Sequence, residues 1–431
     1  MLGAYGCASD ESKAAAGSGG SAGSGGSAGS GGSAGSGGSA GTGSSAGSGS
    51  SAGSGGSAGS GGSAGSGGCT FPAHPQLKAL PNNTALDLGI YECESRAPGI
   101  YCKTIFDYSR INYDPVSHRM LAFGGGHAAS GRTDVDVFDL NTLSWYSLYP
   151  SMSCSEVQAN QVKDAYHLAT GHPTAGHTYD QTVVASIAGQ PYLMMFGREG
   201  FAGACHKSES TSYRSVPKLK LNGTNTTWEY APLGKERPWA YGAAAEFDPI
   251  SGMVIMTGST ASWYQSGLFV FDPNTNQVER VSDGPAKLHS SLLYDPVGDR
   301  MLLVQGDNDP VPVYELTLDR ANWEASKFTL LPTNGTSPPS VTRAWAYDSK
   351  NHVLGGVRNG IFYALDLATH TWSSHTINIS SPNGVTSMGN VHSFAMDYDP
   401  INNVFIFVTN KGQLIEQRVW AYRYAGSACG P

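Results

Sequence analysis

The feature that most constrains this chain is a short pattern that returns about every 50 residues between positions 113 and 400. An aromatic residue, an aspartate and a proline stand together four times, at Tyr113-Asp114-Pro115, Phe247-Asp248-Pro249, Tyr294-Asp295-Pro296 and Tyr398-Asp399-Pro400. A fifth copy, at 347–349, has serine in place of proline. Self-similarity at this period indicates one small structural unit that is repeated along the chain.

Each copy of the pattern is embedded in short segments of β-strand character. A first apolar segment precedes the aspartate turn, and a second one follows it, at 120–126, 253–259, 301–307, 352–358 and 404–410. A third segment ends in another aspartate turn, and a tryptophan often opens a fourth, at Trp145, Trp228, Trp323 and Trp372. Four short strands in about 50 residues predict an all-β protein whose repeated unit is the blade of a β-propeller.

Residues 69–431 resemble a kelch-type propeller. The glycine pair that this family carries after the second strand is present at Gly124-Gly125-Gly126 and at Gly355-Gly356, whereas the third blade has Val278 where a tryptophan would stand. We expect six blades, and seven is the alternative because residues 69–110 are not fully assigned. The resemblance implies an architecture and leaves the activity open, since propellers carry many functions.

Ring closure follows from the strand count, because the last repeat has only three strands before the chain ends. We expect residues 75–80 to supply its outer strand, which would bring Cys69 next to Cys429. Residues 69–431 contain six cysteines, these two included, which allow 15 pairings. The predicted pairs are Cys69–Cys429, Cys93–Cys102 and Cys154–Cys205. An even number of cysteines in this segment favours an oxidising compartment.

The N-terminal part of the chain differs in composition from the rest. Residues 13–68 are almost entirely Gly, Ser and Ala, and such a segment is predicted to be a disordered linker. Residues 1–12 are interpreted as the remnant of a lipoprotein signal with Cys7 as the lipid anchor, because tracts built on SAGSGG after such a cysteine resemble those of bacterial surface lipoproteins. The expected location is the outer membrane or cell surface, or the exterior as a secreted protein.

The negative net charge of the chain argues against nucleic acid as a partner. The chain has a net charge of −8, with 26 Lys and Arg against 34 Asp and Glu, so it lacks the basic footprint of a nucleic-acid-binding protein. The sequence contains no apolar run of about 18 residues, so membrane association is expected only through the lipid anchor. We expect a monomer without a cofactor. A structural metal held by Cys205 and His206 stays open as an alternative, although the sequence has no CxxC or HExxH motif that would support it.

Unequal loops indicate where a site would lie. The aspartate turns are short, whereas the connection at 150–176 and the loop at 199–215 are long. If strands alternate in direction, both long segments lie on the face opposite the aspartate turns, and long loops on a rigid scaffold commonly carry function. The candidate substrate-binding residues expected on that face are Arg132, His177, Arg237, Trp239, Tyr241, His289, Arg343, Trp345 and His392. Any one of them could instead only bind backbone carbonyls between blades.

Three short stretches resemble a family of bacterial propeller proteins that includes ulvan-lyase-like enzymes: FGGGH (123–127), GHTYD (176–180) and FGR (196–198). The resemblance covers the first three blades and implies His127 and Tyr179 as base and acid, with Arg198 neutralising a uronate carboxylate. Proton removal next to a carboxylate requires such a cation. The expected function is therefore a lyase acting on an acidic, ulvan-like polysaccharide.

Two other functions stay open. A glycan- or protein-binding module without catalysis would use tryptophan and tyrosine rings on the same face, and the linker suits capture at a surface. A copper radical site of the galactose-oxidase type would require a Tyr–Cys crosslink, for which Cys205 next to His206 is a faint match. A disulfide at Cys205 would exclude this third function.

Overall fold

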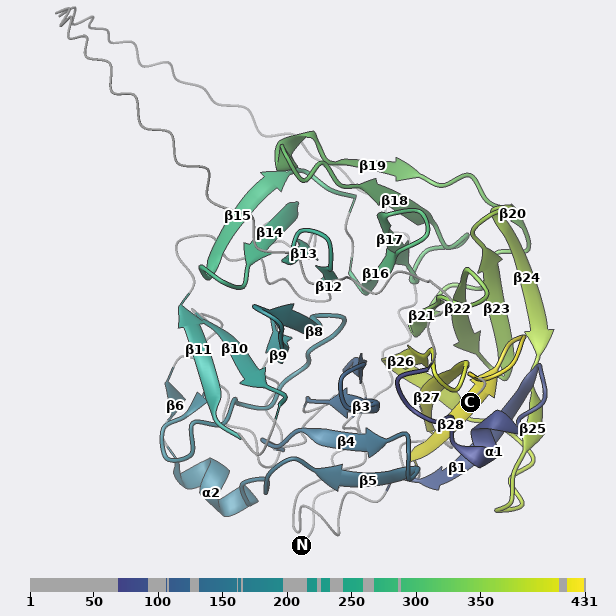
Figure 1. The fold of residues 1–431 in the computed structure, drawn as a ribbon, viewed down its shortest axis with the longest axis horizontal. Coiled ribbons are helices and arrows are strands. Elements are labelled where there is room, and N and C mark those ends of the chain that lie inside the picture. Colours follow the sequence, from purple (N-terminus) through teal and green to yellow (C-terminus); the bar gives the residue numbers. More distant parts are fainter. Residues whose placement is uncertain are drawn as a thin grey trace, which may run out of the picture. The chain divides into compact units, whose positions relative to one another are not determined.

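The computed structural model describes residues 69–91, 106, 108–124, 132–160, 162–163, 166–196, 215–222, 226–232, 243–258, 267–285, 288–410 and 417–429. All statements below concern these residues. The fold is a β-propeller of six blades around one axis, as expected from the repeat (Figure 1). The predicted six blades are therefore confirmed, and helix is confined to three short segments.

Each of the first five blades is one antiparallel run of consecutive strands. Blade 1 contains β2 (Ile111–Asp114), β3 (Arg119–Ala122), β4 (Asp136–Asp139) and β5 (Ser144–Ser147). Blade 2 contains β8 (Thr182–Ile187), β9 (Gln190–Met195), β10 (Ser215–Lys220) and β11 (Trp228–Pro232). Blade 3 contains β12 (Ala244–Asp248), β13 (Met253–Thr257), β14 (Leu268–Asp272) and β15 (Gln277–Ser282).

Blade 4 contains β16 (Ser290–Asp295), β17 (Arg300–Gln305), β18 (Val313–Thr317) and β19 (Lys327–Leu330), with the 3-10 turn η1 (Trp323–Ala325) before β19. Blade 5 contains β21 (Trp345–Asp348), β22 (Val353–Arg358), β23 (Ile361–Asp366) and β24 (Thr371–Thr376), and β20 (Asn334–Gly335) adds to β24 in parallel. The connection between blades 1 and 2 holds α2 (Cys154–Ala159) and the hairpin of β6 (Val162–Lys163) and β7 (Tyr166–His167).

Blade 6 joins both ends of the propeller. Its strands β26 (Asn390–Asp399), β27 (Val404–Asn410) and β28 (Gln417–Arg423) come from the end of the chain, and β1 (Thr84–Ile90) is the outer strand. The small strand β25 (Asn378–Ser380) pairs in parallel with β1. The prediction that residues 75–80 close the ring is wrong: they contain the helix α1 (Pro75–Lys78), which begins with proline at its first position, where a helix tolerates it.

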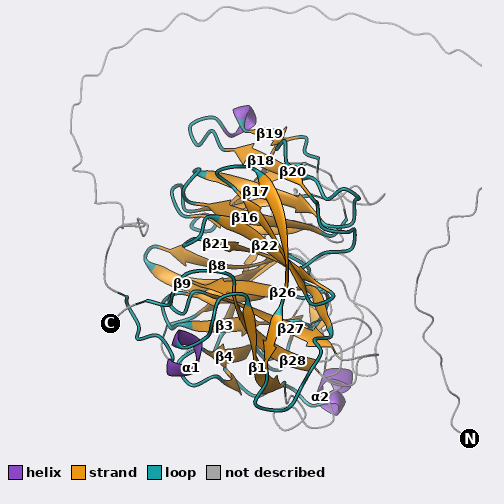
Figure 2. Ribbon diagram, turned by 90° about the vertical axis from the view of Figure 1, so that its right-hand side faces the viewer, coloured by secondary structure: helices purple, strands orange, loops and turns teal. Residues whose placement is uncertain are grey.

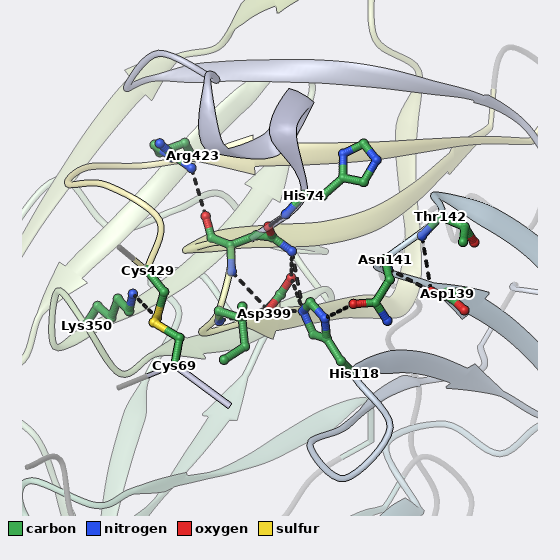
Figure 3. A network of polar contacts seen from close by, with 12 residues as sticks. Cys69, His74, His118, Asp139, Asn141, Thr142, Lys350, Asp399, Arg423 and Cys429 are labelled. Carbon is green, nitrogen blue, oxygen red and sulfur yellow. Dashed lines mark hydrogen bonds and ion pairs between the residues drawn. A yellow bond between two sulfur atoms is a disulfide. The ribbon is translucent and has the colours of Figure 1, made fainter. Parts of the chain in front are cut away.

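The contacts around the closure include a disulfide and a buried ion pair (Figure 3). Cys69 is bonded to Cys429 with their Cα atoms 5.9 Å apart, which confirms this predicted pair. Cys154 is also disulfide-bonded, but its partner, like Cys93 and Cys102, lies outside the described residues. Near the disulfide, the backbone amide of His74 donates to Asn402 (2.8 Å), and Phe71 stacks on His118 with ring centroids 5.1 Å apart.

The hydrophobic core is divided among the blade interfaces. Among the described residues, buried apolar side chains form six clusters, and each cluster combines residues of two neighbouring blades. Strands that are covered on both faces can be apolar at successive positions, which explains runs such as MLLV in β17. The glycine pair of blade 5 allows close packing, because a Cβ at Gly355 would come within 2.8 Å of the Phe405 ring of blade 6.

The aspartate turns have one repeated geometry. Asp114, Asp248, Asp295, Asp348 and Asp399 end the inner strands, and the side chain of each is fully buried. Each carboxylate accepts a hydrogen bond from the backbone amide two residues later, as in an Asx turn. The residue four positions after each aspartate has a positive φ, and these residues are His118, Gly252, Asp299, His352 and Asn403. In the side view, α1 and α2 lie toward opposite ends of the strands (Figure 2).

Candidate functional site

Aromatic side chains from four blades meet where the inner strands begin, at the end opposite the aspartate turns. We call Tyr108, His177, Tyr179, His289 and Phe394 the axial cluster. The ring centroid of Tyr179 lies 5.7 Å from that of Tyr108, 5.9 Å from that of His289 and 6.1 Å from that of Phe394. Tyr108 also stacks on His289 at 5.3 Å. These contacts bring together residues that are up to 286 positions apart only because the blades share one axis.

The backbone of the axial cluster is held in an uncommon conformation. Tyr108, Tyr179, His289 and Phe394 all have φ between 48° and 69°, a region that bulky residues rarely occupy. Hydrogen bonds between neighbouring blades stabilise it: the amide of Tyr179 donates to the carbonyl of Tyr108 (2.7 Å), and the amide of Phe394 donates to that of Arg343 (3.1 Å). Strained backbone that is maintained in this way is concentrated at functional sites.

His177 and Tyr179 form a buried polar pair within the cluster. Nδ1 of His177 lies 3.0 Å from the hydroxyl of Tyr179, and each residue is only 1% exposed. The two side chains point toward each other from alternate positions of the segment that leads into β8. An imidazole bound to a phenol can fix the direction of the phenolic proton and exchange it, which is the requirement for an acid–base residue.

His289, Asp307 and Arg343 form a second polar group beside the first. Asp307 follows β17 and lies 2.6 Å from Nδ1 of His289, and it accepts two hydrogen bonds from the guanidinium of Arg343. Arg343 also donates to the Tyr108 hydroxyl (3.2 Å) and lies over its ring. Burial lowers the pKa of His289, so its imidazole is neutral at pH 7. Burial alone would raise the pKa of Asp307, but His289 and Arg343 hold it below its usual value.

A layer of charged side chains lies further along the same inner strands. Arg110 donates to Glu246 (2.8 Å) and lies 3.5 Å from Asp180. Burial raises the pKa of Asp180 to about 7 and that of Asp397 to about 6. Burial also disfavours the charge on Arg110, but the three carboxylates raise the pKa of this guanidinium. One cation thus faces three acids from blades 2, 3 and 6, and this cluster links the blades below the aromatic rings.

The predicted site residues fall into four groups. Tyr179, His177, His289 and Arg343 lie in or against the axial cluster. His392 is 1% exposed and stands two positions before Phe394. The residues outside the described part of the chain are His127, Arg198, Arg237, Trp239, Tyr241, Cys205, His206 and Cys7.

Two other predicted residues lie away from the cluster. Arg132 is 1% exposed within blade 1, where its guanidinium is paired with Asp134 and Asp136. Trp345 is 4% exposed and packs in the core between blades 4 and 5, and its indole NH donates to the carbonyl of Thr342 (2.9 Å). The contacts of Arg132 and Trp345 therefore stabilise the blades in which these residues lie.

Sequence reasoning did not select Tyr108, Asp307 and Phe394. Asp307 ends the apolar segment 301–307 and therefore stands at the end of a second strand, as Arg198 does in the sequence pattern. The end of a second strand was therefore a sequence signal that could have identified Asp307 as a site residue. Tyr108 lies in the stretch that could not be assigned to a blade, and Phe394 has no polar group that would mark it.

Within the described part of the chain, no group of three or more His, Cys, Asp or Glu side chains is arranged to hold a metal ion. No helix in that part has the length and apolar character needed to cross a membrane.

No family model matches the sequence, and the search of curated proteins found no match. Solved structures do resemble the fold. A Bacteroides thetaiotaomicron protein of unknown function is 11% identical, with 79% of this chain and 75% of that chain covered and a TM-score of 0.45. An auxiliary nutrient-binding protein from the same organism is 9% identical, with 73% and 69% covered and a TM-score of 0.43. An oligogalacturonate lyase in complex with manganese is 10% identical, with 72% and 76% covered and a TM-score of 0.38. At these values the similarity concerns the fold alone.

Proposed function

We propose that this protein acts on acidic, uronate-containing polysaccharides of the ulvan type and cleaves them by β-elimination. The observation that carries the proposal is the buried hydrogen bond between His177 and Tyr179, next to the group of His289, Asp307 and Arg343. A proton-transfer residue held by an imidazole is one component that this chemistry needs, and a cation that neutralises the substrate carboxylate is the other.

The reaction removes the proton at C5 of a uronate, next to its carboxylate. The C4–O bond to the neighbouring sugar breaks, a C4=C5 double bond forms, and the leaving oxygen takes up a proton. Water is not consumed, and the products are an unsaturated uronate and a new chain end. Tyr179 is the proposed proton-transfer residue and His177 its positioning residue. His127 is proposed as the second acid–base group, and Arg198 as the cation that neutralises the carboxylate.

A glycan- or protein-binding module without catalysis is the second candidate. It is favoured by burial, because Tyr179 and His177 are each only 1% exposed and are packed against other rings. A binding module needs only a rigid scaffold at this end of the blades, and it does not require an acid–base pair that a substrate can reach. The two candidates therefore differ in whether any bond is broken.

The decisive experiment incubates the full chain with a panel of acidic polysaccharides and follows the ultraviolet absorbance of unsaturated uronates. For a lyase, Tyr179→Phe is expected to reduce kcat at least about 100-fold with little change in melting temperature. Tyr192→Phe is the matched control, since its hydroxyl lies in the same blade, away from the axial cluster, and it should retain full activity. Binding without a rise in absorbance for any polysaccharide would replace the lyase by the binding module.

Other finer assignments are proposals that support this function. The propeller is proposed to be of kelch type, with residues 1–12 as a lipoprotein signal remnant, 13–68 as a linker and 69–431 as the working domain. The protein would act as a monomer at the cell surface or outside the cell, without a cofactor. Its partner would be an acidic polysaccharide or another glycan, and neither nucleic acid nor the membrane interior would be bound.

A further inference from the structure

An open groove lies at the outer rim of the propeller, between blades 3 and 4. It has a volume of about 390 Å³, in the lower part of the range that ligand pockets occupy. Ser282 at the end of β15 and residues 283–285 after it form one wall, and Tyr314 of β18, Ser326 and the first two residues of β19 form the other. The axial cluster belongs to the starts of the inner strands, so the rim groove is a separate site.

The blade 4 wall presents aromatic surface because of strand register. Tyr314 pairs with Leu330, and Leu316 pairs with Phe328, which places these side chains on one face of blade 4. Leu316 is buried in the core that blades 3 and 4 share, whereas Tyr314 and Phe328 are only partly buried and Leu330 is 55% exposed. Gly284 lets the opposite wall lie close to the Phe328 ring, because a Cβ at this position would be only 3.2 Å from the ring.

Polar groups line the same groove. The hydroxyl of Ser282 is buried and has no hydrogen-bond partner among the described residues, a state that is unfavourable unless a ligand or water satisfies it. Lys327 is exposed at the start of β19. Asp283, the acid that lines the groove, is paired with Arg280 outside it, which leaves Lys327 as the lining charge that can meet a ligand. Such a combination favours an anionic ligand.

We propose that the rim groove binds a sugar residue that carries a carboxylate or sulfate. The apolar face of a sugar ring would pack on Tyr314 and Phe328, its anionic group would pair with Lys327, and a ring hydroxyl would bond to Ser282. A shallow wall of ring surface with polar groups beside it suits a sugar better than a peptide side chain, which needs a deep apolar socket. The site goes beyond the proposed cleavage, because it would hold a polysaccharide away from the axial cluster.

The test measures binding to the full chain by calorimetry, with tetragalacturonate as the anionic probe and cellotetraose as a neutral probe of equal length. Lys327→Glu is expected to weaken tetragalacturonate binding at least about 10-fold. Lys78→Glu is the matched control, because this exposed lysine of α1 undergoes the same charge change and does not line the groove. Its affinity for tetragalacturonate should stay within about 2-fold of that of the unmodified chain. Tyr314→Ala should weaken binding as well, and hydrogen exchange should slow at 314–318 and 326–330 when the probe is bound.

Three results would overturn the rim site. One is equal binding by Lys327→Glu and Lys78→Glu, and another is the absence of tetragalacturonate binding. The third is equally tight binding of a hexa-aspartate peptide with the same dependence on Lys327, which would make the groove a general anion site. The cleavage assay is independent of these results, because Lys327→Glu should leave the rate on a short oligosaccharide unchanged. Failure of the rim site and failure of the lyase proposal are thus distinguishable.

Discussion

The two ends of the inner strands are built in opposite ways. At one end, the five aspartates use the same residue type, the same backbone hydrogen bond and the same left-handed position four residues later. At the other end, the left-handed positions hold Tyr108, Tyr179, His289 and Phe394, and the groups around them differ from blade to blade. The turns at the first end need a carboxylate to bind their backbone amides, so the same residue type stands in each blade. The axial end has no such requirement, so its side chains can differ in chemistry from blade to blade.

The aspartate end also joins neighbouring blades. Asp295 of blade 4 accepts from the hydroxyl of Tyr347 (3.0 Å) and lies 3.3 Å from His352, both of blade 5. Asp399 of blade 6 lies 3.2 Å from Nε2 of His118 in blade 1, so the same arrangement spans the closure. Burial would lower the pKa of His118, but Asp399 raises it. This end of the molecule therefore stabilises the ring, and the axial end is where an irregular site can exist.

The largest effect is expected from removing the strand that closes the ring. A chain that begins at residue 92 lacks β1, which pairs along β28 from Thr84 opposite Arg423 to Ile90 opposite Arg418. It also lacks the disulfide and the contact of His74 with Asn402. The free energy of unfolding, measured in urea, should fall by at least about 5 kcal/mol, because an outer strand and a long-range crosslink are lost together.

The control for this experiment is a chain that begins at residue 69. It keeps β1 and both cysteines, and it should melt like the full chain. Equal stability of the two shortened chains would mean that the contacts of the aspartate end hold the ring closed without β1. Such a result would break the distinction between a structural end and a functional end.

Much of the fold could be predicted because the repeat carries it. The aspartate turns fix the strand order, and the count of strands required a chain terminus to complete blade 6. The pairing of Cys69 with Cys429 followed from that requirement. The strand was placed at 75–80 although Leu86, Leu88 and Ile90 alternate with Asp87 and Gly89 as strand residues do, and no sequence signal showed that Asp87 would be paired inside blade 6. Its carboxylate is buried and bonded to Arg418 (2.8 Å) and Ser381 (2.8 Å), contacts that only the folded ring brings together.

The site was predictable only in part, because some of its contacts also form only between blades of the folded ring. Tyr179 and His177 are neighbours in sequence, so their pairing could be expected from the GHTYD stretch. The contact of Asp307 with Arg343 joins the end of one strand to the start of an inner strand in the next blade, 36 residues away. Whether a polar residue at such a position faces the axis or the core depends on how blades pack, and Arg132 and Trp345 belong to the cores of their blades.

The second prediction tests the aspartate end directly. Asp295→Ala removes a fully buried carboxylate that accepts from two turn amides and from Arg300 (2.9 Å), so this arginine would be left with fewer partners. The free energy of unfolding should fall by about 3–5 kcal/mol. Asp272→Ala is the matched control at a half-buried turn, where the carboxylate serves only its own turn, and it should cost about 1 kcal/mol. Equal losses would mean that contacts between blades add nothing to the turn.

The third prediction uses pH to examine the charged layer near the axial end. Asp180 titrates near pH 7 in the folded chain because it is buried, whereas in the unfolded chain its pKa is near 4. Between these values the folded state binds more protons than the unfolded state. This group therefore destabilises the fold at pH 8, and the stability that it costs is recovered as the pH falls from about 7 toward 4.

Asp180→Asn should remove this dependence while keeping an oxygen that can accept from the amide of Leu292 (2.7 Å). Urea unfolding at several values between pH 4 and pH 8.5 is expected to show the variant more stable than the unmodified chain by about 4 kcal/mol at pH 8, with the difference shrinking as the pH falls and vanishing only near pH 4. The contributions of His118 and His289 are the same in both chains and cancel in the difference, whereas Asp397 shares Arg110 with Asp180 and its own titration is measured in the double variant with Asp397→Asn. A variant that is less stable at pH 8 would mean that the attraction of Arg110 outweighs burial. The charged layer would then stabilise the ring as the aspartate turns do, and the two ends of the blades would not be opposites.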